Sequence, residues 1–136
     1  MRHEDWAERL ADYLAEAARW SFKQGLYDCG HFAAGAVEAM TGVDHLAPYK
    51  GRYESVRGYL RLLKDDGYDS VGAFCTAALG EPISVLLAQR GDVVMTEQDG
   101  LEALGVCNGQ NAVFLSRMGG LVELPMADCS QAWRVA

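Results

Sequence analysis

Gly25-Leu26-Tyr27-Asp28-Cys29-Gly30-His31-Phe32 predicts a turn that delivers a cysteine to the first position of an apolar helix. Asp28 is suited to be the N-cap, because its carboxylate can accept a hydrogen bond from an unpaired N–H of the first helical turn. Cys29 would then lie at the positive end of the helix dipole, where the pKa of a thiol can be depressed toward a reactive thiolate. Cys29 is therefore a candidate nucleophile, and the alternative is a buried cysteine that acts as a small hydrophobic side chain.

The helix that begins at Cys29 is expected to be buried on most sides. Between residues 29 and 41 only His31, Gly35 and Glu38 interrupt the apolar side chains, which leaves a narrow stripe outside the core. Gly42 is placed to end this helix in the left-handed conformation. We expect His31 to be solvated or to lie at an interface.

Composition limits the class of protein. The chain has 136 residues, half of them hydrophobic, which predicts one globular domain over residues 1–136. A net charge of −7 argues against broad binding to nucleic acid or to an anionic membrane surface. No apolar run approaches the roughly 20 residues of a membrane span, and the charged, helical N-terminal pattern is not that of a signal peptide. The four cysteines lack metal-ligand spacing, so we expect reduced thiols, no metal site and no cofactor.

The order of the expected elements predicts an α+β fold. Helical spacing of apolar residues indicates helices over residues 3–19 and 52–66, and a shorter helix capped by Asp69 or Ser70. After Ile83 short β patterns follow one another at residues 91–95, 101–106, 112–115, 121–124 and 132–135. Helices first and strands afterwards are typical of helices packed on an antiparallel sheet.

A basic stripe lies on the outer face of the helix expected over residues 52–66. Arg57, Arg61 and Lys64 are spaced so that they share one helix face. Such a stripe is usually solvated, and in an acidic protein it could instead dock an acidic partner.

Several landmarks occur in the order found in one enzyme class. The Asp-Cys turn is followed by Gly91-Asp92-Val93-Val94, by Gly105-Val106 with a glycine hairpin, and by the tail from Gly119 to Val135. Together they resemble the NlpC-type cell-wall cysteine peptidases, a bacterial branch of the papain-like fold. More closely, the chain is similar to a phage and prophage family related to these peptidases and encoded among tail genes. The resemblance runs from about Phe22 to the C-terminus, with a helical insertion at residues 43–82.

The resemblance implies a role for each matching residue. Cys29 matches the nucleophile, and its own N–H would be one oxyanion donor. Asp92 matches a structural aspartate before the first strand. The general base of active members is a histidine, and the matching position here is Ala103; the residue that would orient the base falls near Leu115 or Ser116. The resemblance also places Asp28, Tyr27 and Gly105 beside Cys29 as binding residues.

No histidine of the chain is expected to replace the missing base. A cysteine peptidase needs an imidazole within hydrogen-bonding reach of the sulfur. His31 lies about 200° around the helix from Cys29. His45 lies past the far end of that helix, ~15 Å or more away, and the sequence does not place His3.

Two functional hypotheses follow. The first is a tail-associated phage or prophage protein with a degenerate, inactive NlpC-type fold, which binds tail-tip or tail-hub proteins in the virion or during assembly in the host cytoplasm. The second is an active cysteine hydrolase that cuts peptidoglycan peptides or a related amide through Cys29 during cell-wall penetration. A third idea is that the vacated cleft binds a cell-wall peptide without cutting it.

Overall fold

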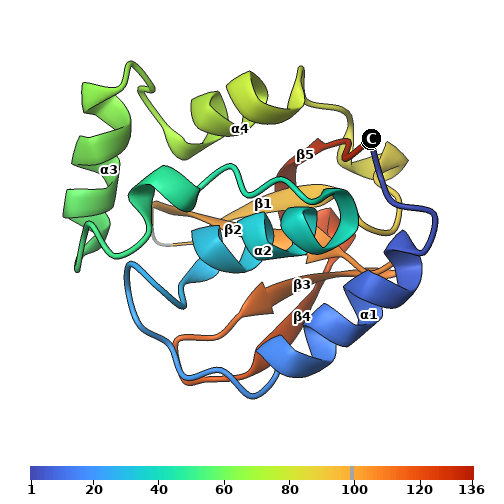
Figure 1. Cartoon of the computed structure of the whole chain (residues 1–136). Helices are drawn as coiled ribbons and strands as arrows, with labels where there is room; N and C mark the ends of the chain where they lie inside the picture. The colour runs from blue at the N-terminus through green and yellow to red at the C-terminus, as the bar shows by residue number, and fades with distance from the viewer. Residues whose placement is uncertain (99) are drawn as a thin grey trace.

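The computed structural model describes residues 1–98 and 100–136, with only the backbone of Gln98 included. Helices occupy the first two thirds of this part of the chain and strands the last third, so the predicted α+β class is confirmed (Figure 1). The α-helices are α1 (Trp6–Ala17), α2 (Cys29–Thr41), α3 (Val56–Asp65) and α4 (Val71–Leu79). The strands are β1 (Val93–Gln98), β2 (Leu101–Cys107), β3 (Asn111–Leu115), β4 (Leu121–Pro125) and β5 (Cys129–Trp133). Short 3₁₀ turns lie at Ala47–Tyr49, Val85–Leu87 and Met126–Asp128.

Side-chain caps fix where three of the helices begin. Asp28 accepts a hydrogen bond from the His31 N–H at 2.8 Å, which confirms it as the N-cap of α2. Ser55 and Ser70 cap α3 and α4 in the same way. The predicted start of the third helix at residue 52 was therefore too early, because α3 begins at Val56. Gly42 ends α2 with a φ of 85°, as expected.

The sheet is antiparallel, in the order β4-β3-β2-β1-β5, and α2 lies across one face of it (Figure 1). The main core fills the space between this face and the helices, and a second apolar cluster covers the opposite face. The fifth strand begins earlier than predicted. Cys129 to Trp133 pair with β1, whereas Val135 leaves the sheet and donates its N–H to Asp92.

Strands β2 and β3 pair over only a short distance. In the described residues their ladder consists of Val106 with Val113 and Cys107 with Ala112, next to the hairpin that joins them. Strand β3 instead keeps five pairs with β4. The β3–β4 hairpin thus diverges from the first half of β2, and this divergence opens one edge of β2 beneath the start of α2.

Burial corrects the interpretation of His31 and agrees with that of the basic stripe. His31 is only 6% exposed, so the expectation of a solvated or interface histidine was wrong. Its ring packs on Tyr53, which the segment after α2 folds back over the turn. The basic stripe of Arg57, Arg61 and Lys64 is exposed, as expected for a solvated helix face.

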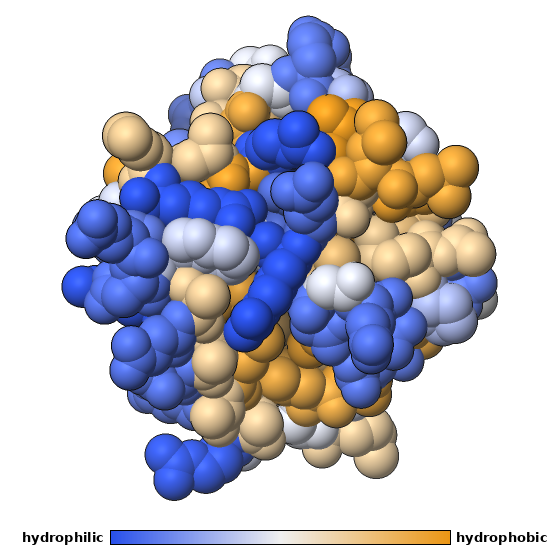
Figure 2. Space-filling view, turned by 90° about the vertical axis from the view of Figure 1, so that its right-hand side faces the viewer, coloured by the Kyte–Doolittle hydropathy of each residue, from blue (hydrophilic) through white to orange (hydrophobic). Residues whose placement is uncertain are grey.

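The buried carboxylate of Asp92 joins the two ends of the chain. It accepts hydrogen bonds from the Arg2 guanidinium at 3.2 Å, from the Val135 N–H at 3.1 Å and from the Gln89 N–H at 2.9 Å. Arg2 also donates to the Val135 carbonyl at 2.6 Å. Figure 2 views the side of the molecule where both ends lie, and hydrophilic side chains cross it between hydrophobic areas.

Replacing Asp92 with alanine is expected to lower the free energy of unfolding by about 3–5 kcal/mol, because the partly buried Arg2 guanidinium and two backbone N–H groups would lose their acceptor. Urea denaturation would measure this loss. The matched control is Asp5→Ala, which removes the exposed partner of Arg9 and should change stability little. Equal effects of the two substitutions would contradict the structural role of Asp92.

Gly105 lies where strand β2 meets β3 most closely. A Cβ atom at this position would collide with the Val113 carbonyl and lie 2.6 Å from the Phe114 ring. We expect Gly105→Ala to destabilise the protein by about 1–3 kcal/mol through overpacking. Gly58→Ala is the control, since its Cβ would meet only side-chain atoms, at 3.2 Å or more. Unchanged stability of Gly105→Ala in the same denaturation assay would contradict the close contact.

Candidate functional site

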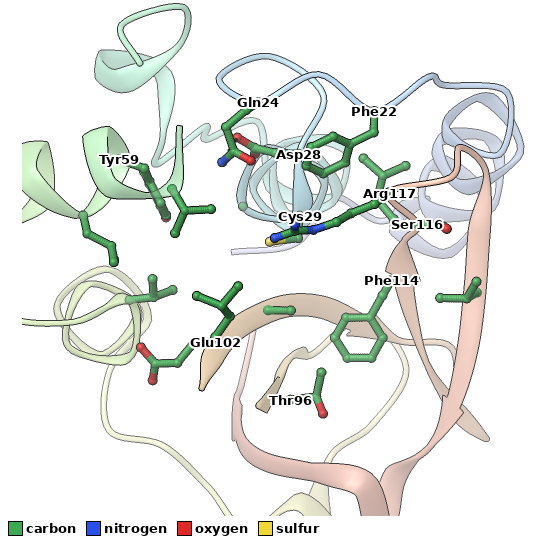
Figure 3. Close-up of a pocket in the computed structure, with 18 of the residues that line it drawn as sticks. Phe22, Gln24, Asp28, Cys29, Tyr59, Thr96, Glu102, Phe114, Ser116 and Arg117 are labelled. Atoms are coloured by element: carbon green, nitrogen blue, oxygen red, sulfur yellow. Dashed lines mark hydrogen bonds between the residues drawn. The ribbon is translucent and has the colours of Figure 1, made fainter. Parts of the chain in front are cut away.

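A cavity of about 410 Å³ lies beneath the first turn of α2, and we refer to it as the Cys29 cavity (Figure 3). Three parts of the chain build its walls. The turn and the start of α2 contribute Phe22, Gln24, Asp28, Cys29 and Gly30. Residues 43–82, which the resemblance interprets as an insertion and which we refer to by that name, contribute Val56, Tyr59, Leu60 and Val71. The sheet and its β3–β4 turn contribute Thr96, Glu102, Ala103, Phe114, Leu115, Ser116 and Arg117, among others. The divergence of β3 from β2 provides the space, and both strands border the cavity.

The Asp28 carboxylate organises the upper wall. It is 1% exposed and accepts four hydrogen bonds. The donors are the Gly25 N–H at 2.9 Å, the His31 N–H at 2.8 Å, the Tyr53 hydroxyl at 2.6 Å and the Gln24 amide at 3.3 Å. Asp28 therefore fixes the turn, the helix start and the insertion relative to one another, and leaves its neighbour Cys29 facing the cavity.

The Cys29 thiol is not activated by its position at the helix start. Burial raises the pKa of the Cys29 thiol above its ordinary value, and hydrogen bonding from the backbone of Leu104 and Gly30 opposes this change without reversing it. The Asp28 carboxylate also raises this pKa, whereas the positive charge of Arg117 lowers it. The pKa of Cys29 therefore moves in the direction opposite to the one that the helix dipole alone suggested, because burial is the largest influence on it.

Ala103 borders the same cavity as Cys29, and no histidine does so among the described residues. His31 is on α2 but packs against Tyr53, and burial lowers the pKa of its imidazole. His3 lies at the opposite end of α2, where its N–H donates to the Met40 carbonyl. His45 borders a separate small apolar pocket. The thiol thus has no imidazole beside it in the described structure.

The structure does not bring the remaining expected site residues together in one cavity. Asp28 lines the Cys29 cavity, as do Leu115 and Ser116. Tyr27 is 42% exposed, packs against Trp20 and borders a different surface hollow. Gly105 does not line the cavity, and the close approach of β3 explains the absence of a side chain there.

Three polar residues of the cavity were not singled out for it from the sequence. Tyr59 comes from α3, Glu102 from β2, and Arg117 from the turn between β3 and β4. In the sequence Tyr59 follows the apolar spacing of the helix expected over residues 52–66. Its hydroxyl is buried and has no hydrogen-bond partner among the described residues. In Figure 3 the Arg117 side chain reaches across the cavity toward the Cys29 sulfur. No local motif signals these three, because their meeting depends on the insertion and on the sheet divergence.

The family comparison covers nearly the whole chain. Residues 1–135 match the family described as a domain of unknown function, DUF6950. The chain belongs to this family. A search of curated proteins found no match for this DUF6950 member.

Two further properties bear on the class of site. Within residues 1–98 and 100–136, no helix of this DUF6950 protein has the length and apolar character needed to cross a bilayer. The same residues contain no group of three or more His, Cys, Asp or Glu side chains arranged to hold a metal ion.

Alkylation of Cys29 by iodoacetamide is expected to show a midpoint above pH 8.5, the ordinary value being about 8.5. Arg117→Gln should move the midpoint higher, because it removes a positive charge that stabilises the thiolate. Mass spectrometry of the modified peptide would identify the site, with Cys29→Ala as the blank. A midpoint near pH 6 or 7 would contradict the raised pKa and favour an activated nucleophile.

Proposed function

We propose that this protein is a tail-associated phage or prophage protein built on an NlpC-type scaffold that has lost its catalytic base. The observation that carries the proposal is the cavity shared by Cys29 and Ala103. Cys29 begins a buried helix and corresponds, in the resemblance, to the nucleophile. Ala103 borders the same cavity and corresponds, in the resemblance, to the histidine base, so the position of the base carries no titratable group.

The electrostatics of the cavity support an inactive site. The raised pKa of the Cys29 thiol keeps it protonated at neutral pH, and a protonated thiol is a poor nucleophile. The neighbouring Asp28 carboxylate does not substitute for a histidine. Asp28 is occupied by four donors, and it raises the pKa of the thiol. The tail role itself rests on the gene setting of the family that the sequence resembles.

The competing candidate is an active cysteine hydrolase of cell-wall peptides. The convergence of the Leu104 and Gly30 backbone and of Arg117 on the sulfur favours it, because such groups could stabilise a thiolate or an oxyanion. This candidate needs a base supplied by the substrate or by a second protein.

A paired experiment distinguishes the two candidate functions. Immobilised tail-hub proteins encoded beside this chain are expected to capture it, and Cys29→Ala is expected to be captured equally, because the assembly role does not use the thiol. Purified protein incubated with muropeptides is expected to release no fragments above the Cys29→Ala background. Failure of capture would contradict the assembly role. Fragment release that disappears in Cys29→Ala would establish the hydrolase.

A further inference from the structure

The Tyr59 hydroxyl is a buried polar group without a partner in the described residues. The side chain is 6% exposed and lines the Cys29 cavity, and its oxygen lies 3.2 Å from the position that a Cβ on Gly30 would occupy. The neighbouring Tyr53 hydroxyl, in contrast, donates to Asp28. Leaving a buried hydroxyl unpaired is costly, and most such groups in native proteins have a partner. Tyr59 is therefore a donor aimed at the first turn of α2 that has no acceptor among the residues that the structure describes.

Arg117 brings a positive charge to the same place. Its guanidinium carbon lies 5.9 Å from the centre of the Phe22 ring, and its charge acts on the Cys29 sulfur (Figure 3). No ion pair joins Arg117 to a carboxylate in the part of the chain that is described. A guanidinium is well suited to bind a planar carboxylate.

The first turn of α2 already has a carboxylate. Asp28 caps this helix and is held by four donors, and its charge raises the pKa of the Cys29 thiol. A ligand carboxylate in the Cys29 cavity therefore depends on the positive charge of Arg117 and not on the helix N-terminus.

The unpaired edge of β2 indicates what kind of molecule carries the anion. Strand β2 extends to Leu101, but its described pairing with β3 stops at Val106. Free strand edges bind extended peptides through backbone hydrogen bonds. The apolar walls provided by Val56, Leu60 and Phe114 suit a hydrophobic side chain, and 410 Å³ lies within the usual range of ligand pockets.

We propose that the Cys29 cavity binds the C-terminal end of a peptide, with the terminal carboxylate between Arg117 and the Tyr59 hydroxyl and the chain along the free edge of β2. The peptide is held and not cut. This site does not depend on the tail role, and it would exist in either kind of protein considered above.

The test uses one short peptide in two forms. Acetyl-Ala-Ala-Leu with a free carboxylate and the same peptide with a C-terminal amide are titrated into the isotope-labelled full chain, and binding is followed by NMR. We expect the acid to bind about tenfold or more tightly than the amide, because the amide cannot form a charge-assisted pair with Arg117. Equal affinity for the two peptides, or no shift with either at millimolar concentration, would overturn the proposal.

Variants locate the carboxylate. Arg117→Gln is expected to weaken binding of the acid about tenfold and leave the amide unchanged, whereas Arg57→Gln, an exposed arginine of α3, should alter neither. Tyr59→Phe is expected to weaken the acid about fivefold without lowering the Tm, because it removes a hydroxyl that is unpaired in the free protein. A loss with Arg57→Gln as large as with Arg117→Gln, or a Tyr59→Phe variant that binds the acid normally, would overturn the assignment. Capture by tail-hub proteins is measured separately, so failure here leaves that result independent.

Discussion

A buried carboxylate that forms no ion pair with any described residue sets the geometry of this protein. Asp28 is held by two backbone N–H groups, a tyrosine hydroxyl and an amide, and by the positive end of the helix that it caps. Uncompensated, such a charge would be strongly destabilising in the interior. Two of its donors lie in the turn, one in the helix and one in the insertion, so satisfying the charge requires these three segments to adopt one arrangement. The position of Cys29 is a by-product of that requirement.

The charge of the second buried carboxylate, Asp92, is compensated by a cation. Its oxygens receive the Arg2 guanidinium together with backbone N–H groups from the turn before β1 and from the segment after β5. The two aspartates lie before different elements, one before a helix and one before a strand. Together they connect the N-terminal segment, the insertion and the C-terminal segment to the sheet and its covering helix.

Local sequence patterns were sufficient to predict most helices and strands, because capping residues and apolar spacing depend only on neighbouring residues. Asp28 and Gly42 delimit α2 through backbone conformations that depend on a few neighbouring residues. Long-range features were not accessible in this way. The burial of His31 depends on Tyr53 folding over it, and the raised pKa of Cys29 depends on how much water the whole cavity excludes. Tyr59 reads as an ordinary core residue of an amphipathic helix, and only the folded chain shows that its hydroxyl is unpaired.

The insertion carries a consequence for how such proteins can diversify. It supplies one wall of the cavity through α3 and α4, yet it contributes no strand to the sheet. The hydroxyl of Tyr53, a residue of the insertion, donates a hydrogen bond to Asp28 in the turn before α2. Side chains on that wall, such as Val56 and Leu60, can therefore be exchanged among homologues with little effect on the register of the strands. In the proposed binding site, the residues of this wall and the residues that set the strand register belong to different segments, so ligand preference can change while the scaffold stays constant.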